Sequence, residues 1–64
     1  MSRGVRVTYE LVDRLNKPNP YAVYYEVDDG PRMLYCRADS APEVDRRMAE
    51  ARRELGTRYN IRYP

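Results

Sequence analysis

The chain has 64 residues, 42% of them hydrophobic and 34% charged, with a formal net charge of +2, one cysteine and no histidine. This length predicts a single domain, residues 1–64, with a marginal core, because a chain of about 60 residues buries only about 60% of its unfolded surface. One cysteine and no histidine exclude an internal disulfide and a tetrahedral zinc site built from the chain's own side chains.

Three segments alternate apolar and polar residues with a period of two, which is typical of half-buried strands: residues 5–11, 21–27 and 32–37. Residues 16–20 separate the first two segments, and their two prolines remove backbone donors and predict a loop. Residues 28–31 separate the second and third with the sequence Asp-Asp-Gly-Pro, in which Asp-Gly is a strong hairpin signal. We therefore predict a three-stranded antiparallel meander.

The same alternation assigns side chains to the two faces of this sheet. In the third strand either face could be the buried one, and we place Leu34 and Cys36 inward because this choice leaves Arg37 in water. The face predicted to lie under a helix carries Val5, Val7, Tyr9, Leu11, Tyr21, Val23, Tyr25, Val27, Leu34 and Cys36. The opposite, open face is predicted to carry Arg6, Thr8, Glu10, Tyr24, Glu26, Met33, Tyr35 and Arg37.

Residues 40–43, Ser-Ala-Pro-Glu, form a capping-box sequence that predicts the start of a helix, with the Ser40 and Glu43 side chains each accepting a hydrogen bond from the other residue's amide. The apolar residues that follow recur at spacings of four, three and four: Val44, Met48, Ala51 and Leu55. This single stripe predicts an amphipathic helix to about Leu55 that packs on the sheet, and Gly56 is the expected residue to end it.

Residues 59–63 alternate again, with Tyr59, Ile61 and Tyr63 on one side, and are compatible with a short fourth strand at an edge of the sheet. The pairing of this strand is left open by the pattern. The overall prediction is an α+β domain: a three-stranded antiparallel meander with one amphipathic helix packed on one face, extended to the order β-β-β-α-β where the fourth strand forms.

The sequence predicts no enzyme, and therefore no catalytic residue, no cofactor and no metal. Without histidine, no Ser–His or Cys–His pair exists to activate a nucleophile, and the three glycines are too far apart for a phosphate-binding loop. Cys36 is interpreted as an inert core residue, because free cysteine is among the most buried residue types. Glu10 and Glu26 are interpreted as cross-strand partners of Arg6 and Arg37.

The seven tyrosines are the most unusual feature of the composition, because phenylalanine and tryptophan are absent. Tyrosine offers a large amphipathic contact area and is favoured in binding hot spots, although it also fills cores where other aromatic residues are missing. Two tyrosines are predicted on the open face. The leading hypothesis is therefore a small non-enzymatic protein–protein interaction module whose partner-binding surface consists of Tyr24, Met33, Tyr35 and Arg37.

Two alternatives come from other classes. Residues 46–64 carry six arginines against two glutamates, whereas residues 21–45 carry six acidic residues against two arginines. The first alternative is a nucleic-acid-binding domain that neutralises phosphates with Arg46, Arg47, Arg53, Arg58 and Arg62. Ion pairs such as Glu43–Arg47 and Arg46–Glu50 would instead make this a solvated helix face. The second alternative is a structural homo-oligomer, such as a homodimer joined through the C-terminal strand.

The lone cysteine favours a reducing compartment, and no apolar run is long enough to cross a bilayer, so the expected location is cytoplasmic, with no membrane partner. The N-terminal residues lead directly into a strand pattern and not into the apolar region of a signal peptide. Small arginine-rich chains without motifs are also typical of bacteriophage or mobile-element accessory proteins that act on a host factor, and we keep this association as part of the leading hypothesis.

Overall fold

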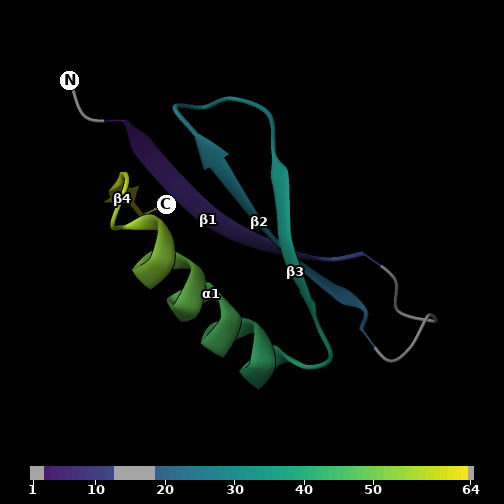
Figure 1. The fold of residues 1–64 in the computed structure, drawn as a ribbon. Helices are drawn as coiled ribbons and strands as arrows, with labels where there is room; N and C mark the ends of the chain where they lie inside the picture. The colour runs from purple at the N-terminus through teal and green to yellow at the C-terminus, as the bar shows by residue number, and fades with distance from the viewer. Residues whose placement is uncertain (1–2, 13–18, 64) are drawn as a thin grey trace.

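A computed structural model describes residues 3–12 and 19–63 of the chain. Its elements in chain order are β1 (Gly4–Leu11), β2 (Tyr21–Val27), β3 (Met33–Ala38), α1 (Ala41–Leu55) and β4 (Asn60–Arg62). They form one mixed sheet with α1 packed on one of its faces (Figure 1). The predicted α+β class, the meander and the order β-β-β-α-β are confirmed. The predicted loop at residues 16–20 lies mostly outside the described residues.

The strand order in the sheet is β3-β2-β1-β4. β1 pairs antiparallel with β2, and β2 pairs antiparallel with β3. β4 pairs parallel with β1, with Val5 beside Ile61. A parallel neighbour needs a crossover connection, and α1 supplies it by carrying the chain from β3 across the face of the sheet to the far side of β1 (Figure 1). The edges of the sheet are therefore β3 and the three-residue β4.

The pairing of β2 with β3 contains an irregularity that reverses part of the predicted register. Val23 lies beside Cys36, but the next residue of β2, Tyr24, lies beside Leu34, so Tyr35 is an extra residue in β3. One extra residue shifts a period-two pattern by one position. The first half of β3 therefore presents the faces opposite to those predicted.

This β-bulge corrects three assignments. Leu34, predicted to be inward, shares the open face with Tyr24 and is 57% exposed. Met33 lies opposite Tyr25, on the side of the sheet that α1 covers, and Tyr35 also packs there against the core. The predictions for Leu34, Met33 and Tyr35 were wrong because they assumed an uninterrupted strand.

The core lies between α1 and the sheet. Its buried residues form one cluster: Val7, Val23, Ala38, Val44 and Ala51. Val5 and Ala22 are also buried, but they lie elsewhere in the sheet. Met48 and Leu55 pack against that cluster, so the predicted helix stripe is confirmed. Tyr9 and Leu11 were also predicted under the helix, but they remain 55% and 40% exposed. A pocket of about 220 Å³ lies beside Tyr9, between β1 and the first turns of α1, so the helix does not cover that end of the sheet.

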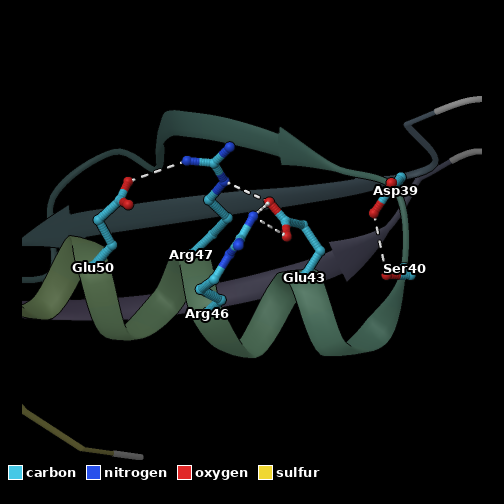
Figure 2. Close-up of polar contacts among 6 residues, drawn as sticks. All are labelled: Asp39, Ser40, Glu43, Arg46, Arg47 and Glu50. Atoms are coloured by element: carbon cyan, nitrogen blue, oxygen red, sulfur yellow. Dashed lines mark hydrogen bonds and ion pairs between the residues drawn. The ribbon is translucent and has the colours of Figure 1, made fainter.

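The ends of α1 differ from the predicted caps. Ser40 is the N-cap residue, but its hydroxyl donates to the Asp39 carboxylate at 3.1 Å and makes no hydrogen bond to the helix (Figure 2). Glu43 turns towards two arginines instead of back to Ser40. Gly56 ends the helix as predicted, but with φ of −64° and not in the left-handed conformation.

The turn between β2 and β3 places two aspartates in the left-handed region. The amide of Gly30 donates to the carbonyl of Val27 at 2.9 Å, and the two central residues, Asp28 and Asp29, have φ of 53° and 60°. Positive φ at both central positions is the signature of a type I′ hairpin turn. The predicted hairpin is confirmed, although its central residues are Asp-Asp and not Asp-Gly.

Candidate functional site

The edge strand β3 carries two exposed large apolar side chains. In the described part of the chain no strand pairs with its outer side. Met33 and Leu34 are adjacent in β3, lie on opposite faces and are 49% and 57% exposed. An unpaired strand edge presents free backbone donors and acceptors, and exposed apolar side chains beside it favour contact with another chain. We refer to residues 32–37 as the β3 edge.

Tyr24 lies beside this edge on the open face, and an arginine covers its ring. The Arg32 guanidinium carbon lies 4.0 Å from the centroid of the Tyr24 ring, and Arg32 Nη1 lies 3.0 Å from Glu10 Oε1. Tyr24 is therefore half-buried and not a bare aromatic surface. Leu34, which is its register partner in β3, supplies the exposed apolar group next to this stack.

Arg37 lies at the other end of β3 on the open face. Its Nε donates to the carbonyl of Tyr21 at 3.1 Å and its Nη2 donates to the carbonyl of Asn19 at 2.6 Å. Within residues 3–12 and 19–63, no carboxylate lies within ion-pair distance of Arg37, and the predicted pair with Glu26 is not formed. The side chain is exposed, and among the described residues no carboxylate pairs with its positive charge at this end of the edge.

Tyr35 is separated from the other predicted partner-binding residues. Its hydroxyl donates to the Glu54 carboxylate at 2.6 Å, and its ring meets the Tyr25 ring edge to face with centroids 6.5 Å apart. The hydrogen bond from the phenol, together with burial, raises the pKa of Tyr35 to about 12. Of the four predicted residues, Tyr24 and Arg37 therefore share the open face, Met33 lies at the edge, and Tyr35 ties β3 to the helix.

A row of carboxylates on α1 follows the helix side of the β3 edge. We call Glu43, Glu50 and Glu54 the acidic flank; together with Arg47 they recur at helical spacing and form one stripe. Glu54 accepts the hydrogen bond from Tyr35, which places this end of the flank against β3, and burial raises the pKa of Cys36 in the same strand. The expected ion pair between Glu43 and Arg47 is confirmed at 2.9 Å (Figure 2).

Two members of the predicted nucleic-acid set are held by this flank. Arg46 Nη2 donates to Glu43 Oε2 at 2.7 Å, and Arg47 Nη1 lies 3.3 Å from Glu50 Oε1 (Figure 2). The predicted pair of Arg46 with Glu50 is not formed, because Arg46 turns back to Glu43. These contacts lower the pKa of Glu43, mainly through the hydrogen bond from Arg46. Both guanidinium charges are therefore partly compensated within the helix.

The other three arginines of that set lie on different elements. Arg53 is on α1, Arg58 is in the turn after the helix, and Arg62 is on β4, and all three are exposed. Arg62 is the register partner of Arg6. A pocket of about 220 Å³ beside them is lined by two arginines, one glycine and three acidic residues: Arg6, Arg62, Gly4, Glu26, Asp28 and Asp29. The five arginines are thus distributed over three elements and interspersed with carboxylates.

The two aspartates of that pocket have structural partners. Asp28 Oδ1 accepts a hydrogen bond from the amide of Gly4 at 2.8 Å, and Asp28 Oδ2 accepts one from Arg3 Nε at 3.0 Å. The Gly4 amide, followed by Arg3, lowers the pKa of Asp28. Arg6 Nη1 lies 3.4 Å from Asp29 Oδ1, so Arg6 forms its ion pair with the turn, although Glu26 is its cross-strand neighbour in β2. These contacts hold the β2–β3 turn against the start of β1.

The sequence missed three residues that matter at the β3 edge. Leu34 was hidden by the bulge, for which a period-two pattern gives no signal. Arg32 was assigned only to the strand, and Glu54 lies outside the apolar stripe predicted for the helix. Their contacts depend on which strand and helix turn lie side by side, and that is a property of the tertiary fold.

Among residues 3–12 and 19–63, no group of three His, Cys, Asp or Glu side chains is placed to hold a metal ion. No helix in the same residues is both long enough and apolar enough to cross a membrane. Comparisons of the chain with protein-family models, with curated proteins and with solved structures find no match.

Proposed function

We propose that this chain is a small protein-binding module that contacts its partner through the β3 edge and the adjoining open face. The observation that carries the proposal is the pair of adjacent residues Met33 and Leu34, each about half exposed on a strand without an outer neighbour. Fully burying a Met or Leu side chain contributes roughly 1.5–3 kcal/mol, so a partner would gain about half of that at each residue. The proposed contact set is Tyr24, Arg32, Met33, Leu34 and Arg37.

This set keeps the protein-binding hypothesis but changes its surface. Leu34 replaces Tyr35, because the Tyr35 hydroxyl is engaged by Glu54 on the helix side. The cytoplasmic location and the role as a bacteriophage or mobile-element accessory protein stay predictions from composition, since the geometry of the edge bears only on binding.

A photo-crosslinking amino acid at position 34 tests the proposal in the cells that express the full chain. The expected result is a covalent adduct with a second protein, identified by mass spectrometry. The matched control is the same amino acid at position 11, because Leu11 is also an exposed apolar strand residue but lies on β1, which β2 separates from the β3 edge. Equal adducts at both positions, or none at position 34, would contradict the proposal.

The nucleic-acid alternative has less support from the charges. Arg46 and Arg47 share Glu43, and Arg47 also contacts Glu50, so two of the five proposed phosphate-binding residues already have anionic partners. Homo-oligomerisation through β4 would use a strand of only three residues, which offers few backbone hydrogen bonds. Both alternatives stay predictions.

A further inference from the structure

The outer side of β3 is bordered by charges of opposite sign on its two faces. On the side of α1 lie the three carboxylates of the acidic flank. Arg46 and Arg47 pair with Glu43 and Glu50, so the net negative charge of the flank comes from Glu54, which directly contacts Tyr35 in β3. On the open face lie Arg32 and Arg37, at the two ends of the strand. Glu10 neutralises Arg32, so the net charge on that face of the edge comes from Arg37.

A second copy of the chain fits this edge poorly. Two copies of β3 joined antiparallel about a two-fold axis form a continuous sheet, in which the same faces of both copies lie on the same side. Glu54 of both copies would then lie on one face of the joined sheet, and Arg37 of both copies on the other face, at opposite ends of the antiparallel pair. Each face would carry net charge of one sign and gain no pairing of opposite charges, so a segment with the complementary charges fits this edge better.

From this pattern we infer that the partner adds an extended segment to β3, with carboxylate side chains on the open-face side and basic side chains on the side of α1. Apolar residues between the basic ones would cover Met33, and the methylene groups of the acidic side chains would pack on Leu34 on the open face. Side chains of a strand alternate between its faces, so a partner sequence with acidic residues at every second position, and basic or apolar residues between, meets both requirements. This inference rests on the proposed function and specifies its partner.

The β-bulge limits where such a segment can pair. Tyr35 interrupts the regular ladder with β2, and bulges at edge strands commonly restrict pairing. An edge of this kind disfavours indiscriminate aggregation and makes side-chain charge a larger part of recognition. We therefore expect backbone hydrogen bonds alone to bind a partner weakly, and we expect binding to depend on the charged side chains on the two faces of β3.

A seven-residue peptide with glutamate at every odd position and Val-Lys-Val at the even positions is the probe. It is titrated into the full ¹⁵N-labelled chain while amide chemical shifts are recorded. We expect the largest shift changes at residues 33–38 and none at residues 60–62. A peptide of the same composition, in which the lysine and one glutamate exchange faces, is the control and is expected to bind at least about threefold more weakly.

Charge reversals on the protein test the two rows separately. Arg37→Glu and Glu50→Lys should each weaken binding of the probe by about three- to tenfold, whereas Arg58→Glu, an exposed arginine on another element, should leave it unchanged. Arg37 also donates hydrogen bonds to two backbone carbonyls, so weaker binding by Arg37→Glu alone has two explanations, lost charge and a folding defect. Glu50→Lys separates them, because among the described residues Glu50 makes only the 3.3 Å contact with Arg47 and its replacement changes mainly the charge.

Each outcome decides a different point. Shift changes centred on β4, or equal binding by all three variants, would overturn the inference. Concentration-dependent shifts at residues 33–38 without peptide would show self-pairing and overturn the choice of occupant. A protein adduct at position 34 without peptide binding would leave the proposed function standing while strand addition fails, and absence of any adduct would remove the proposed function itself.

Discussion

The hydroxyl of Tyr35 donates a 2.6 Å hydrogen bond to the carboxylate of Glu54, joining the edge strand β3 to the last turns of α1. This contact exists because Tyr35 is the extra residue of the β-bulge, which turns the ring from the open face towards the helix. It fixes the position of the acidic flank beside the strand, and with it the charge pattern that a partner meets.

Replacing Tyr35 with phenylalanine should lower the free energy of unfolding by about 1 kcal/mol, because a hydrogen bond to a charged group is lost while the ring contact with Tyr25 stays. Urea denaturation followed by circular dichroism measures the change. Tyr24→Phe is the matched control, since the Tyr24 hydroxyl donates no hydrogen bond to any residue in the described ranges. An equal effect of both substitutions would contradict the role given to the hydroxyl.

The same contact predicts a loss of stability at alkaline pH. The pKa of Tyr35 rises from its usual 10.0 to about 12, mainly because the hydrogen bond to Glu54 favours the protonated phenol. A raised pKa in the folded state means that its contribution is complete below about pH 10 and is lost as the pH rises from 10 towards 12. Tyr35→Phe should flatten this part of the stability profile, and an unchanged profile would count against the assignment.

Replacing Leu34 with threonine should change the free energy of unfolding by less than about 0.5 kcal/mol, because Leu34 is 57% exposed on the open face. The comparison is Val23→Ala, a fully buried position in the neighbouring strand, which should cost about 2 kcal/mol. Chemical denaturation of both variants tests the bulge directly. A large loss for Leu34→Thr would mean that the uninterrupted register is correct after all.

Replacing Asp29 with glycine should stabilise the fold by about 0.5 kcal/mol, because Asp29 has φ of 60° in the type I′ turn and glycine adopts this conformation without steric cost. The ion pair that is lost is weak, at 3.4 Å and with the Asp29 side chain mostly exposed. Thermal unfolding measures the effect. Asp29→Val should be destabilising at the same position, and a gain in stability for valine would argue against a left-handed residue there.

Titration with duplex DNA at several salt concentrations tests the nucleic-acid alternative. Because Glu43 and Glu50 compensate Arg46 and Arg47, we expect weak binding that is unchanged by alanine at these two positions. A steep linear fall of log affinity with log salt concentration, reduced when Arg53 and Arg58 are replaced, would instead support a phosphate-binding surface on the C-terminal third.

The elements themselves could be predicted from local patterns. Period-two alternation located β1 and β2, and the spacing of Val44, Met48, Ala51 and Leu55 located α1 and its buried face. These patterns depend on which side of each element is apolar, and residues close together in the sequence determine that side. The capping box was also a local pattern, but it failed, because Glu43 gains more from two arginines on the next turn than from the amide of Ser40.

The candidate site was predicted only in part. Tyr24 and Arg37 lie on the open face as expected, whereas Leu34 and Tyr35 exchanged faces. A bulge is stabilised by contacts of its extra residue, here the bond from Tyr35 to Glu54, and the two residues are 19 positions apart in the sequence. No local pattern reports such a contact.

The sequence by itself determined the α+β class, the order of the elements and the apolar stripe of α1, because backbone periodicity and side-chain polarity are local properties. Only the tertiary structure decided that β4 pairs parallel with β1, that Arg32 covers Tyr24, and that an acidic row borders one face of β3 while Arg37 marks the other. These relationships depend on which distant segments pack together, and packing is settled by the whole chain burying its core at once.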